Sequence, residues 1–163
     1  MDIRRTAFME PVAQALVAEL QQEFVVRYGG PDETPLDPTM FDAPSGAFFV
    51  GWFEGSPVAT GAWRLRPDVS ALDGTVAAEI KRMYVVPGVQ RRGLARLMLA
   101  HLETTASAAG ADVMVLETGL AQPEAIALYE SSGYTRVEGF GYYRDSPQVR
   151  YFGKRIGQTS DLS

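Results

Sequence analysis

The sequence predicts a single domain of mixed α/β class, with antiparallel hairpins in its first half and β-α-β crossovers in its second half. The length of 163 residues suits one domain with a substantial core, and 46% hydrophobic with 21% charged residues is ordinary for a globular protein. Short apolar segments, helical apolar spacing and Gly/Pro-rich breaks alternate along the chain. The domain is expected to cover residues 1–156, and residues 157–163 are expected to form a mobile tail.

The first half is expected to contain one long helix and four strands. Pro11 suits the first turn of a helix over residues 11–28. A loop rich in Gly, Pro and Asp, with a short helical turn, follows over residues 29–46. The apolar face of the helix comprises Val12, Leu16, Leu20 and Phe24. The strands are predicted over residues 3–8, 47–53, 58–65 and 75–86, with a hairpin turn at residues 54–57.

The second half alternates helices with short strands. A helix over residues 93–109 is ended by Gly110, and a helix over residues 123–132 begins at Pro123 and is closed by Gly133. The apolar face of the first of these helices comprises Leu94, Met98, Leu102 and Ala109. Strands are predicted over residues 113–117, 134–137 and 149–155.

The most informative segment is the turn at residues 86–96, Val-Pro-Gly-Val-Gln-Arg-Arg-Gly-Leu-Ala-Arg, between a strand and a helix. Glycine lets a ligand approach the backbone, and the start of a helix offers free N–H groups and a favourable dipole to an anion. Taken alone, the segment is equally well a surface loop that carries arginines. In a chain with a net charge of −5, however, one acid stands against five bases over residues 79–96: Lys81, Arg82, Arg91, Arg92 and Arg96.

Composition excludes several classes of function. The net charge of −5 disfavours nucleic acid as a partner, and a single basic turn is better suited to a discrete anion. With no cysteine, the chain has no disulfide, thiolate metal site or cysteine nucleophile, and no metal is expected. No apolar run approaches the roughly 20 residues of a membrane helix, and the N-terminal residues do not resemble a signal peptide. A cytoplasmic protein is the simplest interpretation.

Three motifs, in order and in register, resemble the GNAT superfamily of N-acetyltransferases. Residues 90–95, Gln-Arg-Arg-Gly-Leu-Ala, resemble its Q/R-x-x-G-x-G/A signature, and residues 128–134 resemble its L-Y-x-x-x-G-F/Y signature. Glu79-Ile80 resembles the acidic position on the fourth strand of the family. The resemblance covers about residues 3–156. It implies a twisted, mostly antiparallel sheet that is splayed at the cofactor site and flanked by helices.

The resemblance also implies acetyl-CoA as the acetyl donor and assigns residues to it. Backbone N–H groups of the turn would hold the pyrophosphate, and the strand before it would pair with the pantetheine arm while one N–H polarises the thioester carbonyl. Gln122 falls where many relatives carry an asparagine that contacts the cofactor. The expected cofactor-binding residues are Met83, Tyr84, Val85, Gln90, Arg91, Arg92, Gly93, Leu94, Ala95, Arg96 and Gln122.

Acetyl transfer to an amine requires a base and an acid. An amine with a pKa near ~10.4 must lose a proton, and a carboxylate can take it. Glu79 is the first candidate for this base and Glu117 the second. The leaving thiolate needs a proton, and Tyr129 matches the family position for that general acid. The alternatives are a solvated surface carboxylate at Glu79 and a tyrosine that only packs at Tyr129.

The sequence therefore predicts transfer of an acetyl group from acetyl-CoA to an amine of a small molecule or peptide, by direct attack in a ternary complex. A non-catalytic acyl-CoA binding or sensing module is the alternative. The oligomeric state is left open, a homodimer included. A group of acids and aromatics suits a cationic acceptor, and its alternative interpretation is a solvated loop. Its members are Asp32, Glu33, Asp37, Asp42, Phe41, Phe140, Tyr142 and Tyr143.

Overall fold

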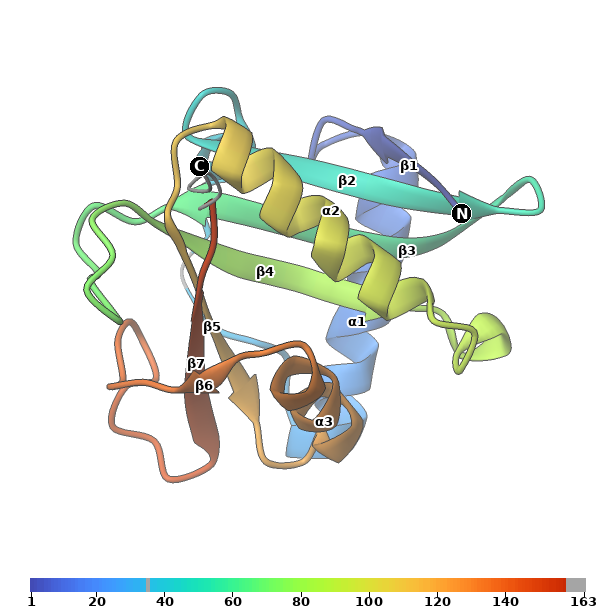
Figure 1. Cartoon of the computed structure of the whole chain (residues 1–163). Coiled ribbons are helices and arrows are strands. Elements are labelled where there is room, and N and C mark those ends of the chain that lie inside the picture. The colour runs from blue at the N-terminus through green and yellow to red at the C-terminus, as the bar shows by residue number, and fades with distance from the viewer. Residues whose placement is uncertain (35, 158–163) are drawn as a thin grey trace.

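The computed structural model describes residues 1–34 and 36–157, and it consists of one seven-stranded sheet between two layers of helices (Figure 1). Helices α2 (Leu94–Ala108) and α3 (Pro123–Ser131) lie on one face of the sheet, and α1 (Pro11–Tyr28) lies on the other. The predicted tail falls outside the described residues, apart from Gly157. The predicted α/β class is confirmed.

The sheet has the order β1-β2-β3-β4-β5-β7-β6. Two short 3₁₀ helices accompany it, η1 (Pro38–Phe41) in the loop after α1 and η2 (Pro87–Val89) before α2. The strands are β1 (Asp2–Arg5), β2 (Gly46–Phe53), β3 (Ser56–Leu65), β4 (Ala77–Val85), β5 (Val113–Gly119), β6 (Thr135–Arg136) and β7 (Val149–Arg155).

Most predicted elements are confirmed, with two corrections in their details. The first strand ends at Arg5 because the chain then turns inward, and Phe8 packs 5.2 Å from Phe41 in the core instead of extending the sheet. Helix α2 ends at Ala108, so that Ala109 is exposed and Ala106 holds the buried position expected of it. Gly110 does end this helix, in the left-handed conformation at φ 104°.

The sheet opens between β4 and β5, the only neighbouring strands that run parallel in the part of the chain that the structure describes. Their pairing covers Ala77–Val113, Ala78–Met114 and Glu79–Val115 and then stops. Beyond Glu79, β4 continues toward the turn before α2 while β5 runs away from it (Figure 1). The predicted splay of a mostly antiparallel sheet is thus present.

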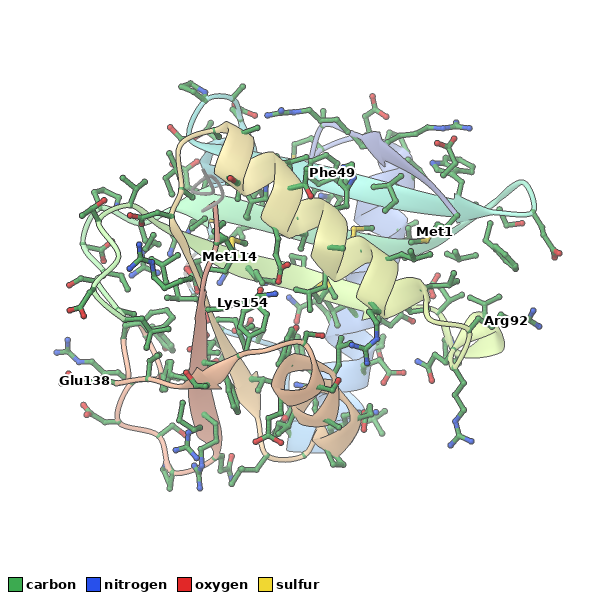
Figure 2. The ribbon with its side chains drawn as sticks, viewed as in Figure 1. Met1, Phe49, Arg92, Met114, Glu138 and Lys154 are labelled. Carbon is green, nitrogen blue, oxygen red and sulfur yellow. The ribbon has the colours of Figure 1, made fainter. Side chains whose placement is uncertain are left out.

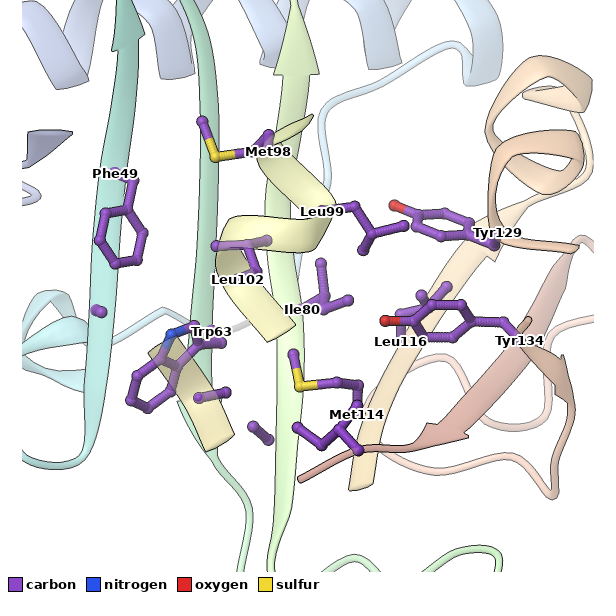
Figure 3. Packing of buried hydrophobic residues seen from close by; sticks show 14 of the residues in the cluster. Phe49, Trp63, Ile80, Met98, Leu99, Leu102, Met114, Leu116, Tyr129 and Tyr134 are labelled. Atoms are coloured by element: carbon purple, nitrogen blue, oxygen red, sulfur yellow. The ribbon is translucent and has the colours of Figure 1, made fainter. Parts of the chain in front are cut away.

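Separate hydrophobic clusters fill the two faces of the sheet. Alternation along β2 places Phe49 beneath α2 and Phe48 beneath α1. A side chain at Gly61 of β3 would lie 2.6 Å from Met98, so glycine is what allows α2 to approach the sheet so closely. Figure 2 shows Phe49 and Met114 within the body of the molecule and Arg92 projecting outward from the turn. The cluster beneath α2 and α3 extends from Phe49 to Tyr134 (Figure 3).

Candidate active site

The turn before α2 presents unpaired backbone N–H groups. Arg91 and Gly93 both adopt positive φ, 68° and 78°, and Gly93 is the N-cap of α2. The N–H of Leu97 makes the first intrahelical bond, to the Gly93 carbonyl at 3.1 Å, so the N–H groups of residues 94–96 have no helical acceptor. A Cβ at Gly93 would meet nothing within 4 Å, so the space above the turn is open. This geometry fits a phosphate group.

Three of the five bases predicted to gather at the turn are found there. Arg92 lies 5.7 Å above the ring of Phe53, and the Arg96 guanidinium donates hydrogen bonds to Ser131 and Ser132 at the end of α3. Arg91 is exposed. The prediction is wrong for the other two bases, Lys81 and Arg82, which are buried in β4.

Strand geometry explains where those two side chains go. Side-chain alternation places Lys81 on the same face of β4 as Glu79, 3.6 Å from its carboxylate. At Arg82 a β-bulge, with φ 57°, turns the side chain inward, where its guanidinium lies 3.5 Å from Asp32. The hydroxyl of Thr60 donates to the Arg82 carbonyl at 2.6 Å and holds the bulge in place.

The end of β4 borders the gap in the sheet. Met83 and Val85 contact the cluster under α2, whereas Tyr84 faces α1 and donates a hydrogen bond to Glu19 at 3.2 Å. The side chain of Gln90 donates to the Val85 carbonyl at 3.0 Å and closes the turn. Since β5 pairs with β4 only as far as Glu79, the edge of β4 that faces β5 can accept an extended ligand.

Glu79 is the centre of a buried ion network. The residue is 2% exposed, which rules out the solvated surface carboxylate considered above. Its Oε1 accepts hydrogen bonds from Arg64 Nε at 3.1 Å and from Arg66 Nη1 at 2.6 Å. Lys81 Nζ lies 3.6 Å from its Oε2. Both oxygens of Glu79 are therefore already engaged with cations.

Glu117, on β5, has a different environment at the same cavity. Burial raises its pKa to about 7; the nearby charges of Glu79 and Asp32 act in the same direction, and that of Lys81 opposes them. Tyr151, on β7, is the residue paired with Glu117 in the antiparallel β5–β7 ladder. The cavity has a volume of about 360 Å³. Its lining residues are Thr34, Arg64, Arg66, Glu79, Glu117, Gly141 and Tyr142.

Tyr129, on α3, belongs to the other face of the sheet. It is 5% exposed, and its ring packs edge-to-face on Tyr134 with centroids 5.7 Å apart. Figure 3 shows its hydroxyl directed toward Leu99 of α2. Burial raises the pKa of this hydroxyl, which keeps it protonated. Glu117 and Tyr129 thus lie on opposite faces of the sheet, beside the strands that part at the gap.

Part of the set of acids and aromatics predicted to bind a cationic acceptor gathers beside the cavity: the Glu33 N–H donates to the Tyr143 hydroxyl at 2.9 Å, and the Tyr143 ring lies 4.8 Å from that of Tyr142. Other members of the set have different partners. Asp32 is paired with Arg82, and Asp37 caps η1 by accepting the N–H of Thr39. The aromatic residues Phe41 and Phe140 are buried in separate clusters. Tyr142 is the member of this set that lines the cavity. The local sequence could not reveal the pairing of Asp32 with Arg82, because the two residues lie far apart along the chain.

Two further features have no counterpart in the sequence prediction. The side chain of Gln122 donates to the hydroxyl of Tyr28 on α1 at 3.2 Å, and its role toward a cofactor stays a prediction. The cavity arginines Arg64 and Arg66 were not anticipated. The sequence does contain a pattern that could have indicated them, because charged residues in or next to an apolar strand must find buried partners.

Within residues 1–34 and 36–157, no helix is long and apolar enough to cross a membrane. In the same ranges, no three His, Asp or Glu side chains are grouped so as to hold a metal ion.

Comparison with known proteins gives a family match over most of the chain and solved structures of similar fold. Residues 14–134 match the model of the acetyltransferase (GNAT) family. An IAA acetyltransferase of Azospirillum brasilense is 30% identical over 154 residues, which cover 94% of this chain and 97% of that protein. A Klebsiella pneumoniae protein described as an acyl-CoA N-acyltransferase has a TM-score of 0.74 at 27% identity, over 95% of this chain and 97% of that one. A GNAT acetyltransferase of Elizabethkingia anophelis, solved with acetyl-CoA bound, has a similar fold: TM-score 0.63, 14% identity, and 95% and 97% of the two chains covered.

Proposed function

The chain belongs to the acetyltransferase (GNAT) family, and from this premise we propose that it transfers an acetyl group from acetyl-CoA to the amine of a small molecule or peptide, by direct attack in a ternary complex. The observation that carries the proposal is the gap between β4 and β5, with a carboxyl group on one side of the sheet and a buried tyrosine on the other. Two ligands that enter from opposite faces would meet there.

We assign the donor to the α2 and α3 face. The N–H groups of residues 94–96 and the backbone around Gly93 suit a pyrophosphate, and the free edge of Met83–Val85 suits the extended arm. Acetyl-CoA supplies the activated acyl carbon. The chain supplies its orientation through backbone groups, which are fixed before the ligand arrives.

Glu117 is the better candidate for the base. Its carboxyl group lines the cavity, and a pKa of about 7 lets it accept a proton near neutral pH without holding that proton too tightly. Glu79 lines the same cavity, but its Oε1 already accepts from Arg64 and Arg66, and its Oε2 lies 3.6 Å from Lys81 Nζ. We therefore assign to Glu79 the role of anchoring the cations, and to Glu117 the role of taking the proton of the amine.

Tyr129 is the proposed acid. In the reaction an N–C bond forms and a C–S bond breaks; the amine proton passes to Glu117, and the hydroxyl proton of Tyr129 passes to the leaving sulfur. The raised pKa of Tyr129 keeps that proton available until negative charge develops nearby. Tyr129 lies near the end of α3, which is joined to the start of α2 by the hydrogen bonds from Arg96 to Ser131 and Ser132.

The test is release of free CoA from acetyl-CoA, followed across a panel of amines, peptides and protein N-termini. The proposal expects release to depend on at least one acceptor and the acetylated amine to appear in equal amount. Tight binding of acetyl-CoA with no turnover on any acceptor would overturn it and favour a non-catalytic acyl-CoA sensor.

A further inference from the structure

The cavity beneath the α1 face contains two arginines whose hydrogen-bonding capacities differ. Arg66 is fully engaged, because Nε and Nη2 donate to Asp68 at 2.8 Å each and Nη1 donates to Glu79 at 2.6 Å. Arg64 donates to Glu79 through Nε alone, at 3.1 Å. Its side chain is 24% exposed, against 10% for that of Arg66. The two terminal nitrogens of Arg64 are thus the donors that this cavity can offer to a ligand.

Two of the three acids around the cavity already have cationic partners. Glu79 is balanced by its cationic neighbours, and Asp32 by Arg82. Glu117 remains as the carboxyl group that the proposed reaction uses. Among the charged residues that line the cavity, a guest therefore meets one cation with unengaged terminal nitrogens, Arg64, and one proton acceptor, Glu117.

We propose that the acceptor is an amine that also carries a carboxylate, which Arg64 binds while the amine faces Glu117. The inference rests on the proposed function and specifies its substrate class. The guanidinium fork of Arg64 matches a carboxylate through its two terminal nitrogens. An amine with a second positive charge in place of the carboxylate would meet that guanidinium and be repelled.

The placement of the two residues suits a small molecule. Arg64 pairs with Glu79, and Glu79 pairs with Val115. Glu117 lies two residues farther along β5, past the last residue paired with β4, so its backbone is more than two strand spacings, about 10 Å, from that of Arg64. Both side chains reach into a cavity of about 360 Å³, which accommodates a molecule the size of an amino acid. The carboxylate and the amine of the ligand would thus lie between the side chains of Arg64 and Glu117.

The experiment compares matched pairs of acceptors: free amino acids and their carboxamides, which share the amine and side chain but differ in charge at the carboxyl end. KM and kcat are measured for each pair with the unmodified protein and with the variants Arg64→Gln and Arg64→Lys. Arg4→Gln is the matched control, because Arg4 lies on the edge strand β1 and pairs with Asp2. Thermal unfolding checks that each variant is folded; after Arg64→Gln, Glu79 keeps Arg66 and Lys81 as partners.

The unmodified protein is expected to prefer at least one free acid over its carboxamide by about 10- to 100-fold in KM. Arg64→Gln should bring the ratio close to one, Arg64→Lys should restore part of it, and Arg4→Gln should leave it unchanged. Turnover of amines with no acid preference would overturn the inference and leave the proposed function standing. A preference that survives Arg64→Gln would also overturn it. Absence of turnover on every acid and every carboxamide, while other amines or peptides of the panel are acetylated, would overturn this inference alone; absence of turnover on the whole panel, with acetyl-CoA bound, would overturn the proposed function as well.

Discussion

The donor and acceptor regions on either side of the β4–β5 gap are built in opposite ways. The turn before α2 relies on consecutive backbone N–H groups, and its shape follows from two residues with positive φ, Arg91 and Gly93. The cavity on the α1 face relies on residues from β3, β4, β5 and three loops. The first region requires one helix start, whereas the second requires the whole sheet to be assembled.

Because of this difference, the two regions are expected to be sensitive to different kinds of substitution. A backbone site tolerates changes of side chain and fails when its dihedral angles change. A site of buried charges fails when one charge is removed, because its partners stay buried without compensation. The following predictions test that contrast.

The largest effect is expected from Glu117→Gln, which should lower kcat by about 10²- to 10⁴-fold without weakening acetyl-CoA binding. Because only the deprotonated carboxylate accepts a proton, the rate of the unmodified protein should rise with pH through about 7. This limb should vanish in the variant, while the rise toward the amine's own pKa near ~10.4 remains. The measurement is the pH profile of kcat/KM for both proteins. A limb near pH 7 that persists in Glu117→Gln would contradict the role of Glu117 as the base.

Glu79→Gln should chiefly affect stability. The buried cations Arg66 and Lys81 and the partly buried Arg64 would lose their shared counter-charge, and the free energy of unfolding should fall by about 3–5 kcal/mol. Urea unfolding measures this loss, with Glu138→Gln, an exposed acid, as the control. If stability is unchanged and the limb near pH 7 disappears, Glu79 is the base.

Tyr129→Phe should lower kcat by about 10²-fold while the affinity for acetyl-CoA stays the same, because only a proton donor is lost. Tyr134→Phe is the control within the same ring pair; its hydroxyl donates to Glu103 at 2.7 Å, so its loss should affect stability more than turnover. Equal losses of kcat and affinity in Tyr129→Phe would indicate a packing role.

Gly93→Val tests the backbone site directly. The open space admits the side chain, but φ 78° strains it and should shift the N–H groups, weakening CoA binding by about 10- to 100-fold. Gly110→Val, at the other end of α2, has φ 104° and equally open space, so it reproduces the strain away from the turn. Calorimetric titration with CoA should separate the two variants; identical affinities would refute the phosphate site.

The smallest effect is expected from Arg91→Ala. Its side chain is exposed and contributes charge rather than shape, so CoA affinity should fall by about threefold, and by less at high salt. Arg136→Ala, exposed on β6, controls for net charge. A loss as large as that of Gly93→Val would mean that side chains, rather than the backbone, build the donor site.

The order of the elements and the turn before α2 could be predicted from the residues, and the splay of the sheet from the family resemblance. These features follow from local periodicity, from glycine and proline at element ends, and from motifs at residues 79–80, 90–95 and 128–134. A helix start offers its N–H groups wherever it folds, so the donor region could be anticipated from one segment.

The residues and charges of the acceptor cavity became apparent only from the tertiary structure. Lys81 and Arg82 looked like part of the basic turn, yet strand alternation and a bulge bury them next to Glu79 and Asp32. The raised pKa of Glu117 arises from burial and from charges on other segments. Desolvation and pairing depend on distances across the sheet, which no local pattern in the sequence encodes.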